Sequence, residues 1–355
     1  MKQIIAHIDM DCFFAACEEK YDPSLVGKPV AIGALPSSNR GVLCTANYEA
    51  RKYGLKSALP ISKAIKLCPN GTYLKPNFIL YKNESSNVMF ELKKFATFIE
   101  QVSIDEAYLD ITAFAKRFPN IEDAAKYIQD HIYNTTKLKC SIGVSESRYV
   151  AKIASDFKKP YGITVVNDMK SFLAPLEVTK ISGIGKKTFE KLKKLNILTI
   201  DNLAKYNTFK LIDNFGTWII GLQELAKGND KSKVNEEYGP RKSISKEMTF
   251  DTDIFLTNCD NYITELINEL DMDKYSFKTV SLKVRFSDFN TISRDISLKI
   301  PMTSKEIIKN KIQYLLNSLK CTNEETKVRL LGIKVSNLIF EADQQMTINS
   351  FCAEC

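Results

Sequence analysis

The chain has 355 residues, a formal net charge of +8, and a composition of 44% hydrophobic and 26% charged residues. Its length suggests two or more domains with a sizeable core. No apolar run approaches the roughly 18 residues that span a bilayer, Asp9 comes too early for a signal peptide, and the nine scattered cysteines form no disulfide framework. These features exclude a membrane protein and a disulfide-stapled secreted domain, and they predict a soluble, intracellular protein.

Strand-like and helix-like segments alternate in the first half of the chain, which predicts a mixed α/β core. We expect a small, loop-rich insert over residues 25–77, where short apolar pieces alternate with Gly, Pro, Ser and Asn. The other predicted elements are strands over 3–9, 100–111 and 140–144 and helices over 13–21, 81–98, 122–135 and 149–155.

Helical patterns continue over residues 169–232, interrupted by a Gly-x-Gly pair. A polar, charged stretch over 231–242 is typical of a linker. Beyond it we expect a separate small α+β domain of about a hundred residues. Its predicted elements are strands over 243–250, 280–286, 292–300 and 330–340 and helices over 258–270 and 304–319.

Two acidic clusters about a hundred residues apart carry the main functional signal. Each places carboxylates in a stretch that is predicted to be a strand, where desolvating an unpaired carboxylate costs several kcal/mol. A bound divalent cation is the usual compensation. Asp9, Asp105 and Glu106, brought together on neighbouring strands, would form a hard oxygen site suited to Mg²⁺. Such a site supports two-metal phosphoryl transfer.

Each cluster also has a structural interpretation. An Asp-x-Asp pair after a strand also occurs in haloacid-dehalogenase-type phosphatases and in glycosyltransferases. Phe13, two positions after the second aspartate, does not fit the phosphatase motif. Capping of the following helix fits Asp11, but it fits Asp9 poorly because Asp9 lies within the apolar strand. Neighbouring strand residues point to opposite faces, so one of Asp105 and Glu106 should reach the site from a bent backbone or an edge. The structural alternative is that either Asp105 or Glu106 forms an ion pair with a nearby lysine.

Tyr48 and Arg51 are three residues apart and would share one face of a helical turn. A hydroxyl beside a guanidinium suits a triphosphate, because arginine gives bidentate contacts. Lys159 adds a further cation before a predicted turn. The structural alternatives are a surface helix for the first pair and simple solvent exposure for the lysine.

A lysine-rich glycine hairpin lies near the middle of the chain. Two glycines allow a tight turn in which backbone N–H groups point outward just before a helix begins. Such a turn can bind a phosphate group of nucleic acid independently of the base sequence. Residues 180–194 contain six lysines and one acidic residue. The positive electrostatic potential of such a segment favours binding of nucleic acid. The structural alternative is a turn that only caps a helix, followed by a solvated helix face. The residues expected to contact DNA here are Ser182, Gly183, Gly185, Lys186 and Lys187.

Several motifs in order along the chain resemble the Y family of DNA polymerases and, within it, the DinB or DNA polymerase IV branch. The hairpin fits this family, and so does Arg241-Lys242-Ser243-Ile244 at the start of the last domain. The resemblance covers essentially the whole chain. The other motifs are Asp9-Met10-Asp11-Cys12-Phe13-Phe14, Thr45-Ala46-Asn47-Tyr48-Glu49-Ala50-Arg51, Ser103-Ile104-Asp105-Glu106-Ala107-Tyr108-Leu109-Asp110 and Ala151-Lys152-Ile153-Ala154-Ser155-Asp156.

The resemblance implies a multidomain α/β and α+β fold with a right-hand polymerase architecture. The implied parts are a palm at 1–12 and 78–168, small fingers at 13–77, a helical thumb at 169–232, a linker at 233–242, a little finger at 243–340 and a tail at 341–355. A monomer that acts in the cytoplasm, near the nucleoid if the source is bacterial, is also implied.

The resemblance also assigns roles to residues. Asp9, Asp105 and Glu106 would bind two Mg²⁺ ions, helped by the Met10 carbonyl. The primer–template DNA would contact the hairpin residues together with Arg241 and Lys242. The residues implied to bind the incoming deoxynucleoside triphosphate are Cys12, Phe13, Phe14, Thr45, Tyr48, Arg51 and Lys159.

Phe14 matches the steric gate of the family, an aromatic ring that leaves no room for a ribose 2′-OH; a plain core role is the alternative. Val42 and Cys44 would roof the nascent base pair. Small fingers and no acidic set for a proofreading exonuclease imply low-fidelity translesion synthesis. The competing interpretations are a catalytically idle DNA-binding scaffold, disfavoured by the full carboxylate set, and a metal-dependent phosphatase.

The C-terminal tail resembles a peptide that binds a sliding clamp, with a frayed terminus as the structural alternative. A glutamine is followed by an apolar residue three positions later and an aromatic residue six positions later. The residues of this expected clamp-binding peptide are Gln345, Met346, Ile348 and Phe351.

Overall fold

A computed structural model describes residues 3–38, 40–230, 232–234, 239–320 and 326–340. The chain divides into two compact units, the first comprising Met1–Leu35 and Val42–Tyr238 and the second comprising Pro36–Gly41 and Gly239–Cys355. Within the part of the chain that the structure describes, no helix combines the length and apolarity needed to cross a bilayer.

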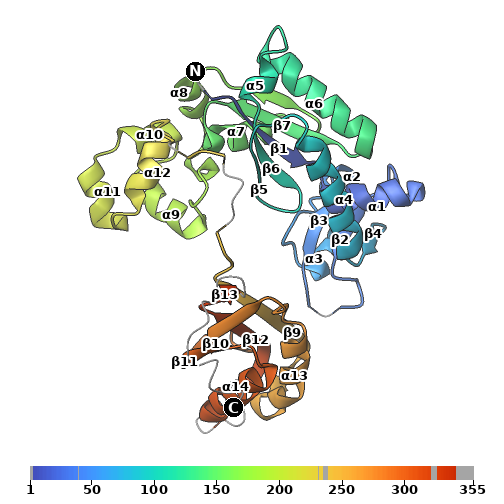
Figure 1. The fold of residues 1–355 in the computed structure, drawn as a ribbon, viewed down its shortest axis with the longest axis vertical. Helices are drawn as coiled ribbons and strands as arrows, with labels where there is room; N and C mark the ends of the chain where they lie inside the picture. Colours follow the sequence, from blue (N-terminus) through green and yellow to red (C-terminus); the bar gives the residue numbers. More distant parts are fainter. Residues whose placement is uncertain (1–2, 39, 231, 235–238, 321–325, 341–355) are drawn as a thin grey trace, which may run out of the picture. The chain divides into compact units, whose positions relative to one another are not determined.

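A five-stranded sheet with the order β5-β6-β1-β7-β8 forms the centre of the first unit (Figure 1). Strand β1 is central and buried along its whole length, and it runs antiparallel to both neighbours. This position explains why residues on both faces of the strand are apolar, with His7 and Asp9 as its polar members. The strands are β1 (Ile5–Met10), β5 (Ile99–Gln101), β6 (Glu106–Asp110), β7 (Cys140–Ser145) and β8 (Ile163–Val165).

Helices cover both faces of this sheet. On one side, Ala6 and Ile8 pack in the same core as residues of α4 (Phe78–Leu92) and α6 (Ile121–Thr136). On the other side, Ile5 packs against Ala151 of α7 (Arg148–Ser155). The backbone of α7 comes so close to β7 that a Cβ atom at Gly143 would lie 2.0 Å from the carbonyl oxygen of Ala151. A short helix, α5 (Thr112–Ala115), follows β6, and another, α8 (Met169–Leu173), packs into the core of the helical layer described below.

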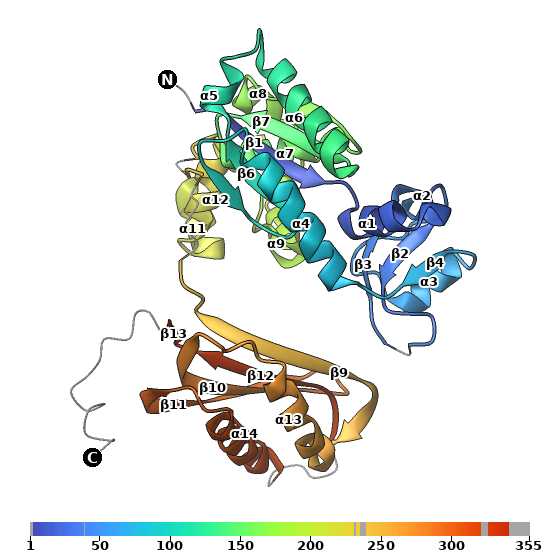
Figure 2. The same ribbon diagram turned by 45° about the vertical axis from the view of Figure 1, so that its right-hand side comes forward.

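The predicted loop-rich insert is in fact a folded layer with its own core (Figure 2). A three-stranded sheet with the order β3-β2-β4 packs against two short helices. The insert is loop-rich, as expected, but the strands and helices within it were not predicted, because each strand is only three or four residues long and gives little periodicity. The elements are α1 (Phe13–Tyr21), η1 (Pro23–Leu25), β2 (Val30–Gly33), β3 (Leu43–Ala46), α2 (Tyr48–Arg51), α3 (Ile61–Leu67) and β4 (Thr72–Leu74).

The predicted single strand over residues 100–111 is broken into β5 and β6 by a turn at 102–105. Asp105 therefore lies in the turn and Glu106 starts the strand, which matches the expectation that one acid reaches the site from a bent backbone. The helix expected over 81–98 runs earlier, from Phe78 to Leu92, because Asn77 caps it by accepting a hydrogen bond from the Leu80 N–H at 3.2 Å.

A helical layer with its own apolar core follows the five-stranded sheet. Val150 and Ile153 of α7 belong to the same core, so α7 packs against both layers. Val234, expected in the linker, is buried with Ile5 and Tyr108, because it is an apolar residue in an otherwise polar stretch. The elements of the layer are η2 (Val178–Lys180), α9 (Lys186–Lys194), α10 (Ile200–Lys205), α11 (Thr208–Phe215) and α12 (Ile219–Ala226).

The second unit is an α+β domain, as predicted from its alternating patterns. Its four long strands have the order β11-β10-β12-β9, and α13 and α14 lie together on one face of the sheet (Figures 1 and 2). The short β13 (Ile339–Phe340) pairs with β10. The other elements are β9 (Ser243–Phe255), η3 (Leu256–Cys259), α13 (Asp260–Asn268), β10 (Tyr275–Phe286), β11 (Thr291–Met302), α14 (Lys305–Lys320) and β12 (Lys327–Ser336).

The contact between α7 and β7 predicts a large cost for a single methyl group. Gly143→Ala should lower the free energy of unfolding by about 3 kcal/mol, because the new atom meets backbone rather than a movable side chain. Gly221→Ala in α12 is the matched control, since nothing lies within 4 Å of its added Cβ, and it should raise stability by about 0.5–1 kcal/mol. Equal effects of the two changes in urea unfolding would contradict this packing.

Candidate active site

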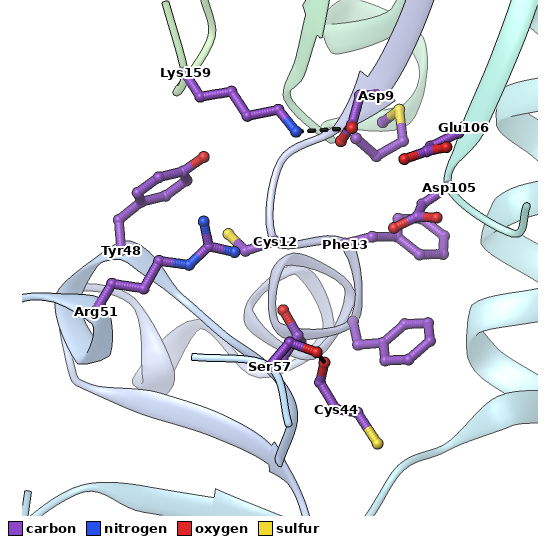
Figure 3. A pocket seen from close by; sticks show the side chains of 13 residues that line it. Asp9, Cys12, Phe13, Cys44, Tyr48, Arg51, Ser57, Asp105, Glu106 and Lys159 are labelled. Carbon is purple, nitrogen blue, oxygen red and sulfur yellow. Dashed lines mark hydrogen bonds and ion pairs between the residues drawn. The ribbon is translucent and has the colours of Figure 1, made fainter. Parts of the chain in front are cut away.

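A cavity of about 250 Å³ opens where the C-terminal end of β1 meets the small three-stranded layer (Figure 3). It brings together every residue that the sequence analysis assigned to metal or nucleotide binding. Cys44, expected to roof the base pair, and Ser57, not singled out earlier, complete the wall. The lining residues are Asp9, Met10, Cys12, Phe13, Phe14, Cys44, Thr45, Tyr48, Arg51, Ser57, Asp105, Glu106 and Lys159.

Strand register places two of the three carboxylates side by side. Asp9 and Glu106 are directly opposite each other in the antiparallel β1–β6 pair, so their side chains leave the same face of the sheet. The turn that carries Asp105 is tied to the same place by a 3.0 Å hydrogen bond from the Met10 N–H to the Asp105 carbonyl. The third carboxylate thus joins the pair through backbone hydrogen bonding.

Each of these carboxylates already has a partner within the protein. The Lys159 Nζ lies 2.7 Å from Asp9 Oδ2 (Figure 3) and 2.7 Å from Asp156 Oδ1, so Lys159 is an ion-pairing residue rather than a solvent-exposed one. Lys152 Nζ donates to Glu106 Oε2 at 2.6 Å. The Ser103 Oγ donates to Asp105 Oδ1 at 2.5 Å.

Burial and these partners move the acidities in opposite directions. Burial raises the pKa of the Asp9 carboxyl to about 7, against the lowering effect of the Lys159 ammonium. Burial alone would lower the pKa of Lys159, but the Asp9 and Asp156 carboxylates raise it above its ordinary value. Within the Asp9–Lys159 ion pair, the lysine is therefore the stronger base and keeps its proton.

His7 and Lys152 lower the pKa of the Glu106 carboxyl to about 2. The His7 Nε2 lies 3.8 Å from Glu106 Oε2, which is beyond hydrogen-bond range, and burial lowers the pKa of His7 itself so that the ring is neutral at pH 7. We therefore attribute most of the shift to Lys152. The role of His7 is structural, because its ring packs against the Tyr108 ring in a tilted arrangement with centroids 4.6 Å apart, and its Nδ1 lies 2.8 Å from Ser155 Oγ.

The donor set fits Mg²⁺ by its chemistry. Three carboxylates line one cavity, and hard oxygen ligands are the ones that this ion prefers. Among the described residues, no group of three or more His, Cys, Asp or Glu side chains converges closely enough to hold a metal as it stands. A lysine or serine donor is bonded to each of the three carboxylates, Lys159 to Asp9, Lys152 to Glu106 and Ser103 to Asp105. A divalent cation would have to replace the Lys159 contact on Asp9.

The opposite wall of the cavity is cationic. Asn47 caps α2 by accepting a hydrogen bond from the Ala50 N–H at 2.9 Å, which orients the one-turn helix that carries Tyr48 and Arg51. The Arg51 guanidinium lies 4.7 Å from the Tyr48 ring centroid, and its Nε donates to the Ala46 carbonyl at 2.9 Å. Figure 3 shows both side chains across the cavity from the carboxylates. The prediction that the two share one helical face is confirmed.

The N-terminus of α1 also faces the cavity. Cys12 precedes the helix in a left-handed conformation, with φ of 41°, and gives no side-chain cap. The first-turn N–H groups of a helix have no acceptor within that helix, and their partial positive charge favours an anion. The capping role considered for Asp11 is absent, because its carboxylate bonds to other segments.

Phe14 lines the cavity and is held by two further rings. It stacks on Tyr81 with ring centroids 4.3 Å apart, and it meets Phe78 edge to face at 5.9 Å. Tyr81 is fully buried, and its hydroxyl donates to Glu18 Oε1 at 2.6 Å. The Phe14 ring is therefore fixed rather than free to turn, whereas Phe13 belongs mainly to the core at 2% exposure.

The glycine hairpin has the conformation that the sequence predicted. Gly183 adopts a left-handed φ of +99°, and Gly185 is the N-cap residue of α9. The segment before the turn is a short 3₁₀ helix rather than a full α-helix. In the second unit, Arg241 and Lys242 are exposed, and Arg241 Nη1 lies 3.7 Å from Asp271 Oδ2. The tail residues Gln345, Met346, Ile348 and Phe351 lie outside the described residues.

Sequence reasoning missed several residues of the site. Lys152 was quoted within a motif but was given no role, and Ser103, Ser57 and Asp11 were not assigned to it. Ser57 donates from Oγ to the Cys44 carbonyl at 2.8 Å and so fixes that wall. All four contribute through hydrogen bonds or ion pairs to other residues of the protein. No spacing pattern in the sequence indicates such contacts.

Comparisons with known proteins agree with this geometry. Residues 8–156 match the impB/mucB/samB family, residues 166–197 match the helix-hairpin-helix motif of that family, and residues 241–348 match its C-terminal domain. The chain is 40% identical to DNA polymerase IV of Methanoculleus marisnigri and 38% identical to that of Staphylococcus epidermidis, with 98% of each chain covered in both cases.

Solved structures give the same result. A chimeric Y-family DNA polymerase built from Dbh and Dpo4 has a TM-score of 0.87 and 29% identity, and DinB from Sulfolobus solfataricus has a TM-score of 0.62 and 28% identity. Each comparison covers 95% of this chain and 99% of the other. The chain therefore belongs to the Y family of DNA polymerases, in its DinB or DNA polymerase IV branch, and is a template-directed DNA polymerase of the translesion type.

Proposed function

We propose that the cavity binds a deoxynucleoside triphosphate and joins its α-phosphorus to the 3′-oxygen of a DNA primer, releasing pyrophosphate. The observation that carries this proposal is the pairing of three carboxylates with a cationic wall around one cavity. A phosphoryl-transfer site needs both, because the triphosphate is held by cations while carboxylates hold metal ions beside it. The ternary complex of Dbh DNA polymerase, 28% identical over 95% of this chain, supports it.

Asp9, Asp105 and Glu106 are the residues that would hold two Mg²⁺ ions, with Met10 beside them. Bound there, the ions would supply Lewis-acid stabilisation of the charge that develops on the attacking and leaving oxygens. Lys159 balances the buried Asp9 charge through its 2.7 Å ion pair. Its ammonium would then turn to the triphosphate when Asp9 takes another partner.

Tyr48, Arg51 and the first turn of α1 would hold the β- and γ-phosphates. Arg51 can give bidentate contacts, and the α1 N–H groups add the helix-dipole contribution. Phe14, clamped by Tyr81 and Phe78, would lie beneath the sugar and exclude a 2′-OH. Cys44 and Thr45 would form the wall on the base side, together with Val42, which is 48% exposed.

The palm, fingers, thumb and little finger are proposed at the boundaries given above. A separate hydrophobic core in the little-finger segment supports this division, and so do cores formed mainly by the thumb and by part of the fingers, although residues of α1 and β2 also pack into the palm core. Gly183, Gly185 and the lysines of α9 would grip DNA phosphates in the thumb, and Arg241 and Lys242 would do so at the start of the little finger. We propose that the protein works in the cytoplasm, on primer–template DNA.

Loss of one carboxylate tests this assignment. Asp105→Asn should reduce primer extension by at least ~10³-fold, because the amide cannot replace a carboxylate ligand of a metal ion that stabilises the transition state. Steady-state extension with Mg²⁺ and one deoxynucleoside triphosphate measures it, with DNA binding followed by fluorescence anisotropy. Asp123→Asn at the exposed start of α6 is the matched control. Activity of Asp105→Asn within tenfold of the unchanged chain would refute the site.

The clamped ring predicts sugar selectivity. Phe14→Ala should raise the use of ribonucleotides relative to deoxyribonucleotides by about 10²-fold or more, since a steric clash rather than a weak preference is removed. The ratio of kcat/KM values for the two nucleotide types gives the answer, with the exposed Phe90→Ala on the same helix as Tyr81 as control. An unchanged ratio would show that Phe14 is not the gate.

The tail is proposed to bind a sliding clamp, on the strength of its sequence alone. Removing residues 344–355 should abolish stimulation of synthesis by the clamp, since the glutamine, apolar and aromatic anchors are all lost. Synthesis without the clamp should stay the same, which separates docking from catalysis. Equal loss of both activities would overturn the proposal.

A further inference from the structure

Asp11 is a buried carboxylate that points away from the active-site cavity. It is 4% exposed and does not line the cavity, although it lies two residues after Asp9. Its backbone N–H donates to the Lys139 carbonyl at 2.9 Å. A buried carboxylate needs several hydrogen bonds to offset its desolvation, and the identity of its donors shows what this one connects.

Three segments meet at the Asp11 carboxylate. Oδ1 accepts from the Tyr48 hydroxyl at 3.1 Å, on α2 of the small layer, and from the Ser141 Oγ at 2.9 Å, on β7 of the large sheet. Oδ2 accepts from the backbone N–H of Tyr161 at 2.8 Å, two residues after Lys159. The Asp11 side chain therefore connects Tyr48 directly, and Lys159 through the backbone N–H two residues later, to strand β7.

Backbone conformation near Asp11 supports a holding role. Tyr161 adopts a left-handed φ of 54°, and Cys12, directly after Asp11, adopts a φ of 41°. A left-handed conformation costs a residue with a Cβ about 1–2 kcal/mol, so each needs tertiary contacts to persist. The hydrogen bond from the Tyr161 N–H to Asp11 is such a contact.

We propose that Asp11 is a positioning residue that sets Tyr48 and Lys159 against the triphosphate. This inference rests on the proposed function, which gives those two residues their ligand. The hydrogen bond that Tyr48 donates to Asp11 holds its side chain at the cavity wall before the triphosphate enters. When the Tyr48 hydroxyl donates to a phosphate oxygen instead, Ser141 and the Tyr161 N–H keep the carboxylate in place. This role of Asp11 depends on where its side chain places hydrogen-bonding atoms and not on its negative charge.

Two substitutions at Asp11 separate positioning from charge. Asp11→Ala leaves the Tyr161 N–H unpaired and frees the Tyr48 hydroxyl, so it should raise KM for the nucleotide about tenfold, the cost of one lost hydrogen bond to a charged group. Asp11→Asn should keep KM within about threefold of the unchanged chain, because its carbonyl can accept from Tyr161 while its amide donates to the two hydroxyl oxygens. The turnover number kcat should change less than KM in both.

A double-variant cycle shows whether Asp11 acts through Lys159. Asp11→Ala and Lys159→Ala should each raise KM, and their combination should be clearly less than multiplicative. Glu84→Ala is the matched control, because Glu84 is also a buried carboxylate, at 1% exposure, with hydrogen bonds to Lys20 and Tyr21 outside the cavity. It should lower the unfolding temperature and leave KM unchanged.

Several outcomes would overturn the inference. One is an unchanged KM for the nucleotide in Asp11→Ala while Lys159→Ala raises it. Another is a double variant whose KM increase equals the product of the two single increases. The third is a KM in Asp11→Asn as high as that of Asp11→Ala. If Asp11→Ala does not fold, Ser141→Ala takes its place and should raise KM in the same direction, and an unchanged value there is equally decisive. An unchanged KM in both Lys159→Ala and Tyr48→Phe would instead refute the triphosphate assignment itself.

Discussion

The ion pair between Lys159 and Asp9 is the contact on which the active site depends. A carboxylate on a fully buried central strand cannot stay charged alone, and the lysine that offsets it comes from a loop more than a hundred residues away. Lys152 does the same for Glu106 from α7. Strand register puts both carboxylates on the face that α7 covers, so α7 and the loop after it supply the compensating charge there.

We propose that the same residues serve two states of the polymerase. With Lys159 on Asp9 and Lys152 on Glu106, each carboxylate of the facing β1–β6 pair has a cation beside it and the strand can be packed. With metal ions on the carboxylates and a triphosphate in the cavity, the lysine has a new anion to meet. Tyr48, Arg51 and the start of α1 would form the fixed part of the proposed anion site, and Asp11 connects Tyr48 to the sheet.

The sequence predicts the elements well where they are long and periodic. It correctly placed α1, α6 and α7 and located the long strands of the C-terminal domain, although the strand expected over 330–340 is two strands, β12 and β13. Charges in apolar strands and a Tyr-Arg pair one helical turn apart are local signals that identified the carboxylates, Tyr48 and Arg51. The resemblance to the family supplied the other expected lining residues, and Ser57 was missed. The sequence missed the three-stranded layer, whose strands are too short for periodicity. It also missed Lys152, Ser103 and Asp11, whose partners lie far away in the chain. The roles of Gly183 and Arg241 in DNA binding stay predictions.

The most direct test of this account is anomalous diffraction from crystals grown with Mn²⁺ in place of Mg²⁺, primer–template DNA and a deoxynucleoside triphosphate. The account predicts manganese peaks among Asp9, Asp105 and Glu106, with the Lys159 ammonium moved from Asp9 to the triphosphate. Manganese bound elsewhere, or Lys159 still paired with Asp9 while the nucleotide is in the cavity, would contradict it.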